Sequence, residues 1–259
     1  MPAEILLQAE NVVMAFGAFR AVNGAALDVR QGEIVGLIGP NGAGKSTFFN
    51  CLAGDLSPTE GRIRFAGSDV TRATPERHAA LGMARTFQVP VTFEDMSVAQ
   101  NVMVGAFLRH GHRLAARRAA EAILEFTGLA HLGSVRAGSL GTPGRKRLEI
   151  ARALATEPRL LLLDEALAGL NPAEVQTAIE LVRRIQARGI TIVIVEHIME
   201  VILTLAERAV VFNQGKVIAA GTPRDVVDDP AVIAAYLGGH MKRLRRRAGK
   251  EAGAEGDSA

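Results

Sequence analysis

Short apolar runs separated by turn residues mark the first 87 positions of the chain, and this pattern predicts β-strands. The predicted strands cover residues 5–9, 26–30, 34–38 and 62–65. Two later runs, residues 160–163 and 190–195, are apolar at nearly every position rather than at alternate ones. Such runs are typical of strands that are buried on both faces of a sheet.

Helical spacing replaces the strand pattern over residues 98–157. Apolar residues recur there three or four positions apart, which predicts amphipathic helices. These residues are Val98, Val102, Ala106, Ala119, Ile123 and Phe126. A further helix is predicted from Pro172 to about Ala187, because Asn171 is a favourable N-cap and proline is favourable in a first turn.

The order of these elements predicts an α/β fold with a helical insertion. Buried strands that are joined through helices pair in parallel by right-handed crossovers. The N-terminal strands and a hairpin over residues 210–219, turning at Gln214-Gly215, add an antiparallel portion. No internal repeat or low-complexity linker occurs before residue 240, so we expect one continuous unit.

Composition narrows the class of protein. Of the 259 residues, 48% are hydrophobic and 22% are charged, which is typical of a compact globular protein. Cys51 is the only cysteine, so an internal disulfide is excluded and a reducing compartment is expected. The longest apolar stretch, residues 190–205, is interrupted by charged residues, and the N-terminus lacks the features of a signal peptide. We therefore expect a cytosolic protein with at most a peripheral membrane role.

The formal net charge of +3 comes from the C-terminal end. Residues 241–259 hold six of the 30 basic residues and three of the 27 acidic ones, so the rest of the chain is balanced. Such a cluster could contact anionic lipid or nucleic acid. Its members are Lys242, Arg243, Arg245, Arg246, Arg247 and Lys250. Small and polar residues follow, and we interpret residues 241–259 as a solvated, disordered tail.

A glycine-rich segment after the predicted strand 34–38 indicates a phosphate site. Its residues are Gly39, Pro40, Asn41, Gly42, Ala43, Gly44, Lys45 and Ser46. An apolar helix is predicted to begin near Thr47, so the spacing and the context are those of a P-loop. Its backbone N–H groups point at phosphate oxygens, Lys45 adds a positive charge, and the Ser46 hydroxyl is a ligand for Mg²⁺. A ligand with β- and γ-phosphates is therefore expected to bind here together with Mg²⁺.

Two carboxylates follow the buried run 160–163, at the sheet edge where open α/β folds bind ligands. Together with the P-loop they indicate attack of water on a bound phosphate. Asp164 would reach Mg²⁺, and Glu165 would orient the attacking water or accept its proton. His197, after the next buried run, is a candidate contact to the γ-phosphate. Taken alone, a histidine at the end of a strand is more often structural, and a loop glutamine such as Gln88 is usually only a hydrogen-bonding surface residue.

The motifs together resemble those of the ATP-binding subunits of ABC transporters. The matching segments are residues 39–46, Gln88, residues 147–154, Asp164-Glu165, residues 169–172 and His197, in the family's order within residues 5–238. The resemblance implies an ATPase with the ABC ATPase fold, which has a RecA-like P-loop core, an antiparallel β portion and a helical subdomain. We expect the ATP-binding domain at 1–240, with its core at 1–87 and 158–240 and the helical subdomain at about 88–157.

The same resemblance implies roles for individual residues. The catalytic residues are Lys45, Glu165 and His197, the last being the switch histidine. The nucleotide-binding residues are Phe16, the P-loop residues 39–46, Thr47, Gln88 and Asp164. The Mg²⁺ ligands are Ser46, Gln88 and Asp164. Phe16 would stack on adenine, with an ordinary core aromatic as the alternative. Gln88 would lie in the loop that couples nucleotide to the membrane subunits, and residues 169–172 in the loop exchanged across a dimer.

A narrower set of motifs resembles the larger ATP-binding subunit of branched-chain amino acid importers. It includes the segments Arg85-Thr86-Phe87-Gln88, Gly169-Leu170-Asn171-Pro172, Phe49-Asn50-Cys51-Leu52 and Val195-Glu196-His197. This resemblance implies two membrane-spanning permease subunits, a second ATP-binding subunit and, indirectly, an external substrate-binding protein as partners. It also implies a peripheral position on the cytoplasmic face of the inner membrane. Substrate choice is expected to lie in those partners.

One segment departs from the family's pattern. ABC subunits carry a five-residue signature, most often Leu-Ser-Gly-Gly-Gln, whose helix contacts the γ-phosphate bound by the opposite subunit. The aligned residues are Leu140, Gly141, Thr142, Pro143 and Gly144. The serine hydroxyl is absent and Pro143 has no N–H, although proline suits a first helical turn. We therefore expect a heterodimer with unequal sites, with a homodimer as the alternative.

Two other functions fit part of the pattern. ATPases of lipopolysaccharide exporters have a similar length and ending, but the segment Arg85-Thr86-Phe87-Gln88 favours the importer. A soluble ABC ATPase that acts on nucleic acid is supported by the basic tail alone. Such proteins usually carry two ATP-binding units, a long coiled coil or a zinc insertion, for which 259 residues with one cysteine leave no room. No nucleic-acid partner is therefore expected.

Overall fold

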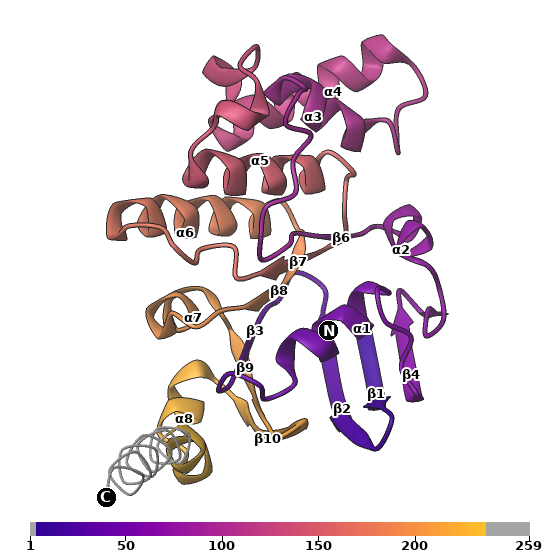
Figure 1. Ribbon diagram of the computed structural model, residues 1–259, viewed down its shortest axis with the longest axis vertical. Coiled ribbons are helices and arrows are strands. Elements are labelled where there is room, and N and C mark those ends of the chain that lie inside the picture. Colours follow the sequence, from indigo (N-terminus) through magenta and orange to yellow (C-terminus); the bar gives the residue numbers. More distant parts are fainter. Residues whose placement is uncertain (1–3, 237–259) are drawn as a thin grey trace, which may run out of the picture.

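The structure, a computed structural model, describes residues 4–236 of the chain (Figure 1). The predicted tail at 241–259 lies outside these residues. Two sheets form the framework. One has six strands in the order β10-β9-β3-β8-β7-β6, and the other has four strands in the order β2-β1-β4-β5. Helices lie between and around the strands, so the predicted α/β class with a helical insertion is confirmed.

The six-stranded sheet is parallel except at one edge. Its strands are β3 (Ile34–Ile38), β6 (Met83–Arg85), β7 (Leu160–Asp164), β8 (Thr191–Val195), β9 (Arg208–Asn213) and β10 (Lys216–Gly221). The edge strand β10 pairs antiparallel with β9, which confirms the predicted hairpin at Gln214-Gly215. The neighbouring pairs β9-β3, β3-β8, β8-β7 and β7-β6 are all parallel.

The second sheet is antiparallel and comes from the N-terminal part of the chain. Its strands are β1 (Ile5–Phe16), β2 (Phe19–Arg30), β4 (Glu60–Phe65) and β5 (Ser68–Asp69). The strands β1 and β2 are longer than the predicted segments 5–9 and 26–30. They extend because their pairing continues through several bulges to Phe16 opposite Phe19, at the end of the hairpin.

Three helices form a separate group at one end of the molecule, above α6 in Figure 1. They are α3 (Val98–Ala106), α4 (Arg113–Thr127) and α5 (Thr142–Leu154). The remaining helices are α1 (Lys45–Ala53), α2 (Pro75–Leu81), α6 (Pro172–Gln186), α7 (Met199–Leu205) and α8 (Pro223–Val227), and two short 3₁₀ turns cover Ala130–Leu132 and Ala137–Ser139. Within residues 4–236, no helix combines the length and the apolar character that a membrane span requires.

Helix boundaries and faces differ slightly from the sequence pattern. Helix α1 begins at Lys45 rather than near Thr47, because Gly44 takes the N-cap position. In α4 the predicted Phe126 is buried and the predicted Ala119 and Ile123 are half-buried, while the most buried positions of the core-facing side are Ala116, Ala120 and Leu124. The small residues allow α4 to pack closely in the core that α3 and α5 share. Helix α6 has the predicted N-cap, Asn171, which forms a capping box with Glu174.

The apolar run in β7 is buried on both faces, as its pattern predicted. Leu160 and Leu162 belong to the core between the two sheets, which also encloses α1. Leu161 and Leu163 point the other way, into the core beneath α6 and α7. Because side chains alternate along a strand, a strand covered on both faces must be apolar throughout.

The ends of three central strands meet at one edge of the sheet. Asp164 at the end of β7 lies opposite Val195 at the end of β8, and Val195 lies opposite Leu37 in β3. The residues that follow these strands are therefore neighbours: the P-loop after β3, Glu165 after β7 and His197 after β8. This edge is the usual ligand site of a parallel sheet.

Candidate functional site

The glycine-rich loop between β3 and α1 packs tightly against the backbone of other strands. A Cβ on Gly39, whose φ is 145°, would lie 2.2 Å from the carbonyl oxygen of Phe212. A Cβ on Gly44, whose φ is 102°, would lie 2.4 Å from the carbonyl oxygen of Ala21. Only glycine fits at these two positions, so they fix the path of the loop and the start of α1.

Lys45 lies across this loop rather than extending into solvent. Its side chain is buried, and its Nζ donates hydrogen bonds to the carbonyl oxygens of Gly39 at 2.8 Å and Pro40 at 3.1 Å. Burial lowers the pKa of Lys45, and the carboxylates of Glu165 and Asp164 oppose that shift. The ammonium group therefore lies between the glycine-rich loop and the two carboxylates at the end of β7.

Glu165 joins two residues that come from distant parts of the sequence. Its Oε1 is 2.6 Å from Nε2 of His197, and its Oε2 accepts a 2.7 Å hydrogen bond from Nε2 of Gln88. The structure thus brings the predicted carboxylate, histidine and glutamine together in one hydrogen-bonded group. A carboxylate held in this way is in position to orient a water molecule and to accept its proton.

Asp164 is buried beside Glu165, with Arg85 as its partner. The Nη2 atom of Arg85 is 3.3 Å from Oδ2 of Asp164. Burial raises the pKa of Asp164, and the Arg85 guanidinium opposes that increase most strongly. The same guanidinium donates to Oδ1 of Asn50 at 3.0 Å, forms an ion pair with Asp55 and stacks over the ring of Phe87. Arg85 therefore ties the end of α1 to the end of β7.

The predicted Mg²⁺ ligands are all oxygen donors, which is the chemistry that Mg²⁺ prefers. Ser46 is exposed in the first turn of α1 and Asp164 is the last residue of β7. Gln88 donates through its amide nitrogen to Glu165, so its amide oxygen faces elsewhere. Within residues 4–236, no group of three or more His, Cys, Asp and Glu side chains could hold a metal without further ligands. The residues fit an ion that also binds substrate phosphates and water.

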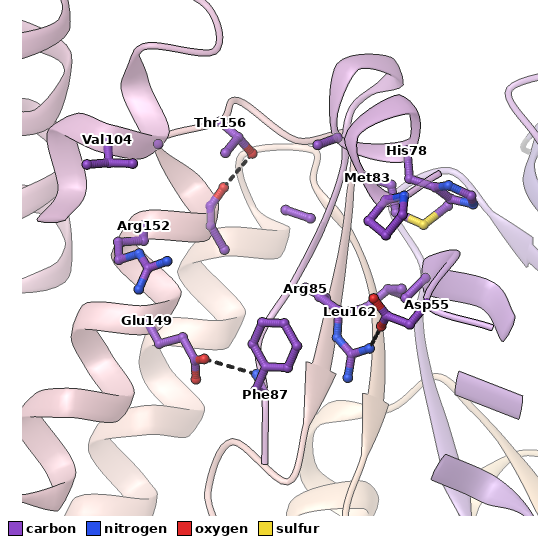
Figure 2. Close-up of a pocket in the computed structure, with 16 residues that line it drawn as sticks. Asp55, His78, Met83, Arg85, Phe87, Val104, Glu149, Arg152, Thr156 and Leu162 are labelled. Atoms are coloured by element: carbon purple, nitrogen blue, oxygen red, sulfur yellow. Dashed lines mark hydrogen bonds and ion pairs between the residues drawn. The ribbon is translucent and has the colours of Figure 1, made fainter. Parts of the chain in front are cut away.

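A cavity of about 240 Å³ lies beside this site, between the core and the helical group (Figure 2). Asp55, His78 and Arg85 line it from the core, and Val104 and Arg152 line it from α3 and α5. Phe87 also lines this cavity, and Figure 2 shows its backbone N–H bonded to Glu149 at 3.1 Å. The loop that carries Gln88 is thereby attached to helix α5.

Two predicted site features lie on other elements. Phe16 is at the end of β1 and is 51% exposed, beside the more exposed Phe19, so the alternative of an ordinary core aromatic is wrong. Residues 140–144 form the start of α5, where Gly141 is the N-cap and Pro143 lies in the first turn. The roles of both features in nucleotide binding stay predictions.

Sequence reasoning missed some contacts of the site. Arg85 was only a marker of family resemblance, and its bond to Asp164 spans 79 positions. Lys146 and Glu149 on α5 also had no predicted role, yet Lys146 donates to the backbone of Glu165 and Glu149 accepts from the backbone of Phe87. The only available signal was the presence of charged residues among apolar ones in a helix.

Known proteins match most of this chain. Residues 22–168 match the ABC transporter family, and residues 216–242 match a family described as branched-chain amino acid ATP-binding cassette transporter. The ATP-binding protein BraF of high-affinity branched-chain amino acid transport in Pseudomonas aeruginosa is 38% identical over 249 residues, covering 90% of this chain and 98% of that protein.

Two further matches concern a different transport system and a solved structure. The lipopolysaccharide export system ATP-binding protein LptB of Acidithiobacillus ferridurans is 37% identical over 233 residues, with 90% of this chain and 97% of that protein covered. A crystal structure of an ABC-transporter ATP-binding cassette in its ADP conformation has a TM-score of 0.82 and 34% identity, covering 91% of this chain and 100% of that chain.

Proposed function

This chain belongs to the ABC transporter family of ATP-binding proteins, and we propose that it is the ATP-hydrolysing subunit of an importer for branched-chain amino acids. One observation carries the proposal: His197 and Gln88 both bond to the Glu165 carboxylate, beside Lys45 and Asp164. This arrangement supplies a base, a cation and an acidic metal ligand where a P-loop would hold the phosphates.

The identity of the transported substrate rests on relatives. The match at residues 216–242 and the similarity to BraF both point to branched-chain amino acids. The similarity to LptB is nearly as high, at 37%. The segment Arg85-Thr86-Phe87-Gln88 and the family match near the C-terminus favour the importer.

The residues of the site divide the chemistry between them. Lys45 would bind the β- and γ-phosphates and offset the negative charge that develops during hydrolysis. Glu165 would accept a proton from the attacking water, while His197 and Gln88 keep its carboxylate oriented. Ser46, Gln88 and Asp164 would hold Mg²⁺, and the bound ion would supply positive charge that offsets the negative charge of the phosphates.

The partners follow from the same proposal. We expect a second ATP-binding subunit and two membrane-spanning permease subunits, with the chain at the cytoplasmic face of the membrane and an external binding protein that delivers substrate. Binding of ATP would close the two ATP-binding subunits on each other, and release of phosphate would reopen them.

Transport specificity gives the direct test of this function. Cells that lack this chain are expected to lose uptake of radiolabelled leucine, and the wild-type chain is expected to restore it. Lipopolysaccharide export, followed by the appearance of labelled lipopolysaccharide in the outer membrane, should be unchanged. Normal leucine uptake together with failed export would assign the chain to the exporter instead.

The unusual segment at residues 140–144 predicts unequal ATP sites. Pro143 offers no N–H in the first turn of α5, and Gly141 offers no hydroxyl, so this segment should bind a γ-phosphate weakly. A homodimer of this chain is therefore expected to hydrolyse ATP more slowly than the assembled complex, by about tenfold if a single charge-assisted hydrogen bond is lost.

Restoring the segment provides the control for that expectation. The double variant Gly141→Ser, Pro143→Gly is expected to raise hydrolysis by the homodimer, measured as phosphate release per site. The single variant Thr142→Ala removes the nearest hydroxyl of the same segment and supplies neither missing group, so it should not raise hydrolysis. A wild-type homodimer that hydrolyses ATP as fast as the complex would contradict the proposed asymmetry.

A further inference from the structure

The catalytic carboxylate stands on a turn with an unfavourable backbone conformation. Glu165 has a φ of 46°, in the left-handed region that residues with a side chain rarely adopt. Its N–H donates to the carbonyl oxygen of Val195 at 2.9 Å. This bond fixes the amide group of Glu165 but not its carbonyl group. A conformation of this kind persists where the surroundings hold it in place, and such positions cluster at functional sites.

The N–H of Ala168 closes this turn by donating to the carbonyl oxygen of Glu165 at 3.1 Å, and two buried charged side chains also hold it. Lys146 on α5 is 7% exposed, and its Nζ donates a 2.7 Å hydrogen bond to the carbonyl oxygen of Glu165. Glu196, just after β8, is 2% exposed, and its Oε1 accepts a 2.8 Å hydrogen bond from the N–H of Leu167. The turn over residues 165–167 is thus held from one side by α5 and from the other by β8.

The charges of these two side chains are close enough to affect each other. Burial lowers the pKa of Lys146 and raises the pKa of Glu196, and each of the two charges opposes the shift of the other. Oε2 of Glu196 is buried without a hydrogen-bond partner in the described part of the chain. Burying a charged side chain costs free energy unless the group is hydrogen-bonded or paired, so the hydrogen bonds that these two side chains make to the backbone of the turn offset part of that cost.

We propose that Lys146 and Glu196 are positioning residues that hold the turn at 165–167. The Glu165 carboxylate thereby keeps its hydrogen bonds with His197 and Gln88. The proposal rests on the proposed function, in which Glu165 acts on the attacking water. Neither residue touches the P-loop through a hydrogen bond in the structure, so their effect should fall on the chemical step rather than on nucleotide binding. Because Lys146 belongs to α5, a shift of that helix would move the backbone of Glu165 through the Lys146 hydrogen bond.

Replacing Lys146 with methionine tests this proposal. Lys146→Met keeps the length of the side chain and removes the bond to the Glu165 carbonyl. In the complex purified through the tagged full chain, kcat for ATP hydrolysis is expected to fall by about tenfold to a hundredfold, as small misplacements of catalytic groups do. KM for ATP, and the affinity of the isolated chain for ADP, should change by less than about twofold because the P-loop is intact.

Three further variants separate positioning from a general effect on folding. Arg118→Met removes one positive charge from an exposed position on the neighbouring helix α4 and leaves the Lys146 bond in place, so it is expected to retain the wild-type kcat. Lys146→Arg, which keeps a donor, should recover part of the lost kcat. Glu196→Met should lower kcat without a change in KM, as Lys146→Met does.

The outcomes distinguish this proposal from the function on which it rests. A Lys146→Met complex with wild-type kcat would overturn the proposal. So would a loss of ADP affinity or of thermal stability in proportion to the loss of kcat, because that would indicate a structural role. If the wild-type complex itself neither binds nor hydrolyses ATP, the proposed function fails and no variant is needed to show it.

Discussion

Replacing Glu165 with glutamine is expected to lower ATP hydrolysis by about 10²–10⁴-fold while leaving ATP binding intact, because the variant loses its general base. Glutamine has nearly the same shape, so Lys45 and the P-loop keep their geometry. The amide cannot accept a proton from water, and its NH₂ group cannot accept the hydrogen bond that Gln88 donates to Glu165. Hydrolysis and binding should therefore separate in this variant.

The measurements are phosphate release by the complex and affinity for ATP by equilibrium binding. Glu200→Gln is a matched control, because it makes the same chemical change on an exposed side chain in α7, close in sequence to His197. It is expected to hydrolyse ATP at the wild-type rate. Hydrolysis by Glu165→Gln within a few-fold of wild type would show that another group acts as the base.

The same variant also tests the partners of the protein. A chain that binds ATP without hydrolysing it is expected to remain in the closed dimer. Tagged Glu165→Gln, purified from detergent-solubilised membranes, should carry two multi-span membrane proteins and a second ATP-binding subunit that mass spectrometry identifies. Recovery only as a soluble self-associated chain, or with bound nucleic acid, would contradict the transport role and leave the family assignment in place.

The parts of the site that the sequence predicts are those encoded by contiguous residues. The P-loop is a single segment with fixed spacing, and Asp164 and Glu165 directly follow an apolar strand. Parallel pairing then brings His197 to the same edge, because strands β7 and β8 end in register. Two rules are sufficient to find these groups without knowledge of any tertiary contact. Ligands bind at the carboxyl ends of parallel strands, and a P-loop has a fixed spacing of glycines, lysine and serine.

The supporting contacts follow no such rule. Arg85 and Asp164 are 79 positions apart, Phe87 and Glu149 are 62 apart, and the bonds between them involve single side chains from separate elements. Nothing in the local pattern states which carbonyl or carboxylate a charged side chain in α5 or β6 will reach. The boundaries of β1 and β2 were underestimated for the same reason, since bulged pairing tolerates polar residues in a long hairpin.

The methionine variant of Lys45 is expected to lose most of its affinity for nucleotide. In the structure Nζ bonds to two P-loop carbonyls, and in the proposed function it binds the β- and γ-phosphates. A hydrogen bond to a charged group contributes about 1.5–3 kcal/mol, so the dissociation constant for ATP should rise by about 10- to 100-fold. Hydrolysis should fall further, because the charge that develops on the phosphates is no longer offset.

Lys45→Met should differ from Glu165→Gln in the step that fails, and this difference is the strongest check on the assigned roles. Lys216→Met is the matched control, because it removes the same charge from an exposed position on β10, and it should bind ATP as the wild type does. Burial already disfavours the charged form of Lys45, so its loss should not unfold the chain, and thermal melting without nucleotide measures this directly. At one fixed ATP concentration, the melting temperature should rise much less for Lys45→Met than for the wild type or for Glu165→Gln, because its dissociation constant is higher. Equal stabilisation of all three by ATP would show that Lys45 does not bind the phosphates.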